Sequence, residues 1–68
     1  MNKTDMLNFL ETAREISEYN DCPIYAFSNG KSIKIVAKLD WFEEVREKLT
    51  NDGYWVCSIF ENGHMVDL

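Results

Sequence analysis

The chain has 68 residues, 46% of them hydrophobic and 13% aromatic, with a formal net charge of −5. This size predicts a single domain, residues 1–68, close to the lower limit for a self-sufficient core, and the composition is typical of a folded chain. The acidic charge argues against a general duplex-DNA binder, and no apolar run approaches the roughly 18–20 residues that a membrane span needs.

Residues 5–19 are predicted to form an amphipathic helix capped by Thr4. Its apolar stripe follows the i, i+3, i+4 spacing of a helix face and consists of Met6, Phe9, Leu10, Ala13, Ile16 and Ser17. Acidic residues lie inside this N-terminal pattern, so it does not resemble a signal peptide, and we expect a cytoplasmic protein. Asn20, Asp21 and Pro23 are expected to end the helix, because Pro23 disfavours helical backbone in the residue before it.

The next stretch predicts a β-hairpin around Asn29-Gly30, the residue pair that a two-residue type I′ turn favours. If Ser28 and Lys31 flank that turn, the strand register follows by counting. On one side the expected pairs are Ala26 with Ile33, Ile24 with Ile35 and Cys22 with Ala37. On the other side they are Phe27 with Ser32 and Tyr25 with Lys34.

A second helix is predicted from Asp40, which would be its N-cap, with Glu43 completing a capping box. Its apolar stripe contains Phe42, Val45 and Leu49, and Gly53 suits the left-handed position that ends a helix. The last stretch predicts another hairpin, around Asn62-Gly63. Its expected pairs are Ile59 with Val66, Cys57 with Leu68, Phe60 with Met65, and Ser58 with Asp67.

These elements predict an α+β fold with two layers and αββαββ order. Two helices would pack on one face of a four-stranded antiparallel sheet made of two Asn-Gly hairpins. Each helix has one apolar stripe, so the face that meets the helices should be the more uniformly apolar one. That core face would contain Cys22, Ile24, Ala26, Ile33, Ile35, Ala37, Trp55, Cys57, Ile59, Val66 and Leu68.

The opposite face of the sheet would then be open and rich in aromatic residues. It would present Tyr25, Phe27, Lys34, Val36, Tyr54, Val56, Phe60 and Met65. An exposed apolar patch of this kind tends to mark a binding surface, although aromatic residues also favour strands in general. It could bind another protein or a second copy of the chain, or it could stack single-stranded nucleic-acid bases on its aromatic rings.

Charge gives a second candidate surface. The segment 22–39 carries Lys31, Lys34 and Lys38 and no acidic residue, whereas the helices are acidic. On the second helix the candidate protein-binding residues are Glu43, Glu44 and Glu47. They form either a solvated outer face or an acidic surface for a basic groove in a host complex that handles nucleic acid.

No enzyme, metal site or other cofactor is expected. His64 is the only histidine, and Cys22 and Cys57 are too far apart in sequence for a zinc signature. Because the sequence shows no sign of secretion, reduced thiols are expected, and a disulfide would require the two strands that carry them to be neighbours. No catalytic or phosphate-binding motif is present.

The sequence therefore predicts a non-enzymatic, small acidic protein-binding domain that acts as an inhibitor or adaptor on another protein. Mobile elements use proteins of this type against host machinery, and anti-CRISPR proteins are one example. The alternatives are a single-stranded nucleic-acid-binding module and a small homodimeric structural protein.

Overall fold

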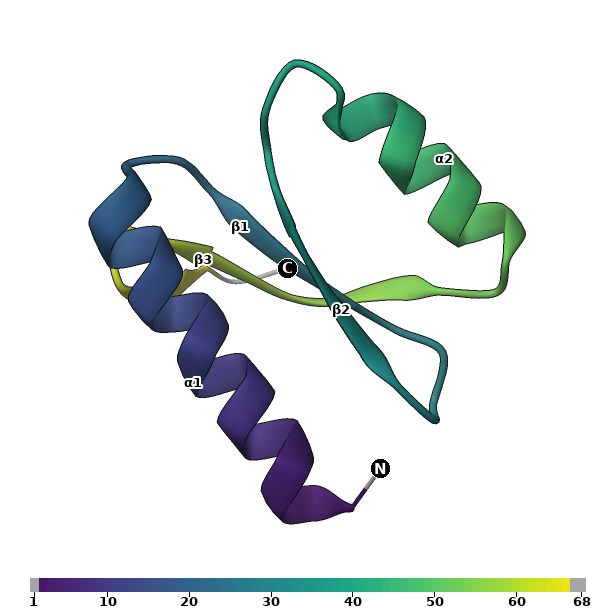
Figure 1. The fold of residues 1–68 in the computed structure, drawn as a ribbon, viewed down its shortest axis with the longest axis horizontal. Coiled ribbons are helices and arrows are strands. Elements are labelled where there is room, and N and C mark those ends of the chain that lie inside the picture. The colour runs from purple at the N-terminus through teal and green to yellow at the C-terminus, as the bar shows by residue number, and fades with distance from the viewer. Residues whose placement is uncertain (1, 67–68) are drawn as a thin grey trace.

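The computed structural model describes residues 2–66, which form two helices and a four-stranded antiparallel sheet, an α+β arrangement. In chain order the elements are α1 (Lys3–Asn20), β1 (Ile24–Ser28), β2 (Ile33–Ala37), α2 (Phe42–Asn51), β3 (Trp55–Glu61) and β4 (His64–Val66). The strand order in the sheet is β2-β1-β3-β4, so β2 and β4 form its two edges. In Figure 1 the strands β1, β2 and β3 cross one another between the two helices.

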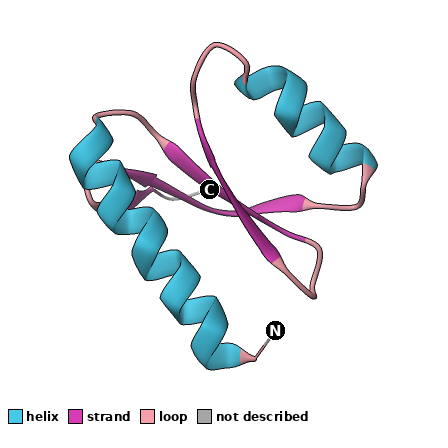
Figure 2. Cartoon of the chain, in the orientation of Figure 1, coloured by secondary structure: helices cyan, strands magenta, loops and turns pink. Residues whose placement is uncertain are grey.

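The two helices lie on opposite sides of the sheet, which stands between them in Figure 2. On the α1 side, Ala13 packs with Ile24 and Phe60. On the α2 side, Phe42 and Leu49 pack with strand residues of the other face, described below. The prediction that both helices share one face is therefore wrong. Because both faces of the sheet are apolar, a helix on each face buries more apolar surface than two helices on one face would.

Helix α1 is fixed to the sheet through its C-terminal half. Ser17 is fully buried, and its hydroxyl donates to the Arg14 carbonyl at 2.6 Å while accepting the Gly63 amide at 3.0 Å. The second bond ties the helix to the β3–β4 turn. The N-cap is Asn2 rather than the expected Thr4, since the Asn2 side chain accepts the Asp5 amide at 2.8 Å.

Helix α2 begins at Phe42, and its N-cap, Trp41, makes no side-chain capping bond. The predicted Asp40 cap is therefore wrong. The predicted end is confirmed, because Gly53 has φ +90°. The Tyr54 amide donates to the Leu49 carbonyl at 2.9 Å and the Gly53 amide to the Thr50 carbonyl at 3.1 Å, which is the bonding pattern of a Schellman motif.

The first hairpin has a four-residue loop, residues 29–32, instead of the predicted two-residue turn. The Asn29 side-chain carbonyl accepts the Lys31 and Ser32 amides, each at 2.9 Å, and this local bonding competes with a type I′ turn. The pairs are consequently Ser28–Ile33, Phe27–Lys34, Ala26–Ile35, Tyr25–Val36 and Ile24–Ala37. They differ from prediction by two positions, an even number, so the predicted faces of β1 and β2 are retained.

The second hairpin has a two-residue turn in which Asn62 and Gly63 have φ values of 51° and 82°. Ile59 pairs with Val66 and Phe60 with Met65, as the sequence predicts. The predicted pairs with Asp67 and Leu68, and the core position of Leu68, lie outside the described residues.

Strand β3 contains a bulge that changes which residues share a face. Ala26 pairs with Ser58 but Phe27 pairs with Val56, so Cys57 is the extra residue. Val56 therefore lies on the α2 side, while Phe60 lies on the α1 side, where it packs with Ala13 and Ile24. The prediction that Val56 and Phe60 share one open face is wrong for this reason.

Candidate protein-binding surface

The aromatic sheet face that the sequence predicts to be open is covered by α2. Phe27 and Val36 are buried with Phe42 and Leu49, and Tyr25, Val45, Tyr54 and Val56 pack around them. The expectation that Tyr25, Phe27, Val36, Tyr54 and Val56 are exposed is thus wrong. Phe60 is buried as well, under α1.

Three aromatic rings hold α2 over this face. The rings of Tyr25 and Phe42 have centroids 4.5 Å apart, and those of Phe27 and Phe42 are 6.2 Å apart, both in tilted arrangements. Such tilted pairs are favourable because the positive edge of one ring meets the negative face of the other. The aromatic residues of β1 therefore stabilise the position of a short helix.

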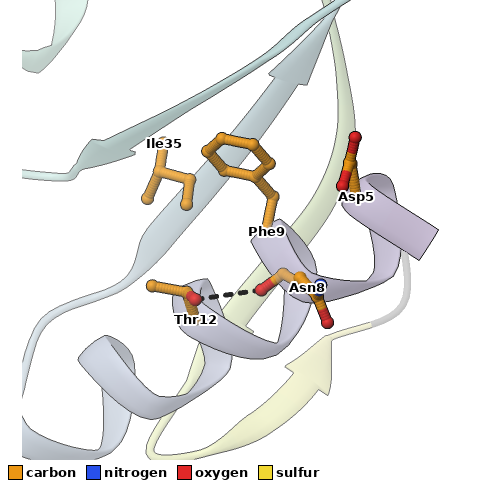
Figure 3. A pocket seen from close by; sticks show the side chains of 5 residues that line it. All are labelled: Asp5, Asn8, Phe9, Thr12 and Ile35. Carbon is orange, nitrogen blue, oxygen red and sulfur yellow. Dashed lines mark hydrogen bonds between the residues drawn. The ribbon is translucent and has the colours of Figure 1, made fainter. Parts of the chain in front are cut away.

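A groove opens on the other side of the sheet, between the N-terminal half of α1 and β2. It has a volume of about 500 Å³ and is lined by Asp5, Asn8, Phe9, Thr12 and Ile35. Figure 3 shows the Phe9 ring turned toward Ile35, with the other three residues on the same helix. The Phe9 side chain remains 42% exposed.

The polar groups of this groove are few. The Thr12 hydroxyl donates to the Asn8 carbonyl at 2.9 Å, so its proton is already committed to the helix backbone. The Asp5 carboxylate lies in the first turn of α1, where the helix dipole favours a negative charge. The groove thus combines an apolar wall with one acidic group.

The groove exists because the side chains of α1 that face the sheet are small in its C-terminal half and large in its N-terminal half. Ala13 and Ser17, in the C-terminal half, are small and fully buried, which lets the helix approach the sheet closely there. Met6 and Phe9, on the same stripe, are large and exposed. The helix has 18 residues, about 27 Å at 1.5 Å per residue, whereas a five-residue strand spans about 17 Å. The first turns of α1 therefore extend beyond what the strands can cover.

Lys34 and Lys38 lie along the sheet edge on the α2 side. The Lys34 ammonium is 5.8 Å from the centre of the Tyr54 ring, and the Lys38 ammonium is 5.9 Å from that of Tyr25. Both lysines are exposed. The tyrosines that were expected to form an open surface instead position these two charges, and the Tyr54 hydroxyl lies 3.0 Å from the Ser32 hydroxyl.

The acidic residues of α2 are exposed, as expected for either interpretation of that surface. Glu43, Glu44 and Glu47 line a shallow hollow with Arg46, Thr50 and Asn51. Arg46 forms an ion pair with Glu43 at 2.6 Å, which offsets part of the negative charge. Met65, on β4, is also exposed, and it is the one aliphatic residue of the predicted patch that stays accessible.

The residues with reactive side chains are dispersed. Cys22 and Cys57 are free thiols, and burial raises the pKa of the Cys57 thiol above its ordinary value. His64 is exposed beside the β3–β4 turn. Across residues 2–66, no group of three or more His, Cys, Asp or Glu side chains is arranged to hold a metal ion. Neither α1 nor α2 has the length and apolarity to cross a membrane.

Comparisons with protein-family models, with curated proteins and with solved structures found no match to this chain.

The sequence patterns do not predict a binding role for the groove residues Asp5, Asn8, Phe9, Thr12 and Ile35. Phe9 and Ile35 both belong to regular apolar patterns, which predict core positions for them. The available signal was the mismatch between a long helix pattern and short strand patterns, which leaves part of the helix stripe without a partner.

Proposed function

We propose that this chain is a non-enzymatic protein-binding domain, an inhibitor or adaptor, that binds another protein through the groove between α1 and β2. One observation carries the proposal: Phe9, an aromatic residue on the core stripe of α1, is 42% exposed and lines an apolar groove with Ile35. Partly exposed aromatic residues in such positions are typical anchors of protein interfaces.

The proposed occupant is an apolar side chain from a segment of the partner protein. A pocket for a small polar ligand usually has several converging polar groups that fix its orientation. Here the Thr12 hydroxyl is bonded within the helix, and Asp5 and Asn8 are the remaining polar residues of the lining. Apolar burial against Phe9 and Ile35 would supply the main favourable term.

The inhibitor or adaptor role, of which anti-CRISPR proteins are one example, is part of this proposal. It is supported by the small acidic chain and the exposed apolar groove. The nucleic-acid alternative requires aromatic rings that bases can stack on. Phe27 and Phe60 are in the core and Tyr25 and Tyr54 pack beneath α2, so burial does not favour that alternative.

A pair of matched variants tests the proposal. Phe9→Ser removes the anchor, and Leu7→Ser makes the same kind of change at an exposed residue of the same helix that does not line the groove. Each tagged protein would be incubated with lysate of the cell from which the gene comes, and retained proteins would be identified by mass spectrometry. We expect a partner that the parent chain and Leu7→Ser retain and that Phe9→Ser loses, with unchanged circular dichroism.

Retention of the same proteins by all three chains would contradict the proposal. Charge reversal at Glu44 and Glu47 provides the contrast, because it changes the acidic α2 surface and leaves the groove intact. If that variant alone loses the partner, the acidic helix is the binding surface. Light scattering on the parent chain and on Phe9→Ser tests the homodimer alternative. If the parent has the mass of a dimer and Phe9→Ser that of a monomer, the groove binds a second copy of the chain and not a foreign protein.

A further inference from the structure

The edge of the sheet beside the groove has backbone groups available for pairing. The Lys38 amide donates to the Pro23 carbonyl at 2.9 Å, and the Asn29 amide to the Ser32 carbonyl at 3.4 Å. These bonds mark the two ends of the β1–β2 ladder. In an antiparallel ladder, bonded and non-bonded pairs alternate, so Lys34 and Val36 bond to β1.

The residues that alternate with Lys34 and Val36 along β2 direct their backbone groups away from β1. Ile33, Ile35 and Ala37 therefore present backbone N–H and C=O groups to the outer edge, where the Ala37 carbonyl also accepts the Leu39 amide at 2.9 Å. Figure 1 views the molecule with β2 in front of β1 and β3, and neither helix crosses in front of it. Because β2 is an edge strand and β1 is its one hydrogen-bonded neighbour in the described sheet, these outward backbone groups are not paired with another strand of residues 2–66.

Charge along this edge is positive although the chain as a whole carries −5. Lys34 and Lys38 lie on the same side of β2, and each ammonium group is held near a tyrosine ring. The ion pairs found within residues 2–66 are made by Arg14 and Arg46 and do not involve these two lysines. Lys34 and Lys38 are four residues apart, which is about 13 Å along a strand. Two negative charges with the same spacing on an added strand could therefore lie opposite both lysines.

We propose that β2 binds an extended acidic segment of the partner protein as a fifth strand. The inference rests on the protein-binding function proposed above and specifies the chemistry of the partner. Alternate side chains of an added strand point to opposite faces. Apolar side chains of the segment would enter the groove beside Phe9 and Ile35, and two acidic side chains four residues apart would lie opposite Lys34 and Lys38.

Charged residues on both sides of the β2 edge favour a segment that alternates apolar and acidic side chains in this register. On the groove side, the Asp5 carboxylate would repel an acidic side chain and leave an apolar one unaffected. On the α2 side, the lysines would attract acids and repel bases. A segment whose alternation is shifted by one residue would place its acids toward Asp5 and is therefore disfavoured.

A second copy of the chain fits this edge poorly. If two β2 strands paired in antiparallel fashion with Ile35 opposite Ile35, the two Lys34 residues would be diagonal neighbours about 7–8 Å apart. A shift of register that pairs Ile33 with Ile35 would set Lys34 directly opposite Lys34. Like charges so placed are destabilising, and neither β2 strand offers an acid to offset them.

Nuclear magnetic resonance of the ¹⁵N-labelled full chain tests the inference with a defined probe. The probe is the acetylated and amidated peptide TEVTVET, whose two glutamates are four residues apart and whose valines share the other face. The control peptide, TKVTVKT, has the same pattern with lysines. We expect TEVTVET to shift the backbone amide signals of Ile33, Ile35 and Ala37, and TKVTVKT to bind roughly tenfold more weakly or not at all.

Charge exchange provides the matched variants. The double variant Lys34→Glu with Lys38→Glu should reverse the preference, so that TKVTVKT becomes the better ligand. Lys48→Glu, at an exposed lysine in the last turn of α2, should leave the preference for TEVTVET unchanged. Equal binding of both peptides by the parent chain, or shifts that map to α2, would overturn the inference.

The failure of this inference is distinguishable from the failure of the proposed function. If Phe9→Ser loses a lysate partner while neither peptide shifts the β2 signals, the groove binds a partner but β2 does not accept an acidic strand. If the β2 amide signals instead move with protein concentration in the absence of peptide, β2 pairs with a second copy and the acidic-segment inference is wrong.

Discussion

Replacing Phe27 with alanine tests whether α2 covers the aromatic side of the sheet. The Phe27 side chain is 1% exposed and its ring centroid lies 6.2 Å from that of Phe42 on α2. Removing a buried phenylalanine side chain costs about 3–5 kcal/mol, including the cavity left behind. A chain of 68 residues has a total free energy of unfolding of roughly 3–10 kcal/mol, at about 0.05–0.15 kcal/mol per residue. Phe27→Ala should therefore remove about a third or more of the free energy of unfolding.

The assay is urea denaturation followed by circular dichroism, with Trp55→Ala as the matched control. Trp55 is another large aromatic residue of the sheet but is 53% exposed, so its removal should cost about 1 kcal/mol or less. Equal m values would show that the two variants unfold by the same transition. A Phe27→Ala variant within 1 kcal/mol of the parent, together with a severely destabilised Trp55→Ala, would refute the assignment of the sheet faces.

Three further predictions concern single contacts. Ser17→Ala should lower the free energy of unfolding by about 1–2 kcal/mol, because it leaves the partly buried Gly63 amide without its acceptor, and an unchanged urea midpoint would contradict that bond. Gly63→Ala should cost about 1–2 kcal/mol through its φ of 82°, measured in the same way, and no change would mean that the turn differs from type I′. In a Cys22→Ser background, Cys57 should react with iodoacetamide more slowly in the folded protein than in urea, because its raised pKa leaves less thiolate at pH 8; equal rates would contradict its burial.

Single glycines and Asn-Gly pairs in the sequence predict where α2 ends and where the second hairpin turns, because these features depend on one or two residues. Gly53 ends α2, and Asn62-Gly63 forms a two-residue turn, because few other residues accept positive φ. Asn29-Gly30 contains the same pair but forms a longer loop, since the Asn29 side chain bonds the following amides instead. Propensity alone does not distinguish these two outcomes.

The packing of the helices could not be predicted because both sheet faces are apolar. Alternation assigns residues to faces only while the register is continuous, and the bulge at Cys57 interrupts it. Trp55 and Phe60, five positions apart, consequently lie on the same face although simple alternation places them on opposite faces. No residue at this bulge is a glycine or proline that would have indicated it.

The candidate site was missed for a related reason. Phe9 follows the spacing of the α1 core stripe, and Ile35 follows that of a buried strand, so each was assigned to the core. Whether a residue on such a stripe is covered depends on how far the partner element extends, which is a tertiary property. Ala13 and Ser17 meet the sheet, whereas Phe9 lies in the part of α1 that flanks the groove.

The most direct measurement for the proposed function is site-specific photo-crosslinking in lysate. The photoreactive residue p-benzoylphenylalanine would be placed at position 9 in one variant and at position 44 in another, because Phe9 lines the groove and Glu44 lies on the acidic face of α2. We expect a covalent adduct with a partner protein from position 9 and none from position 44. An adduct from position 44 alone would contradict the groove as the binding surface.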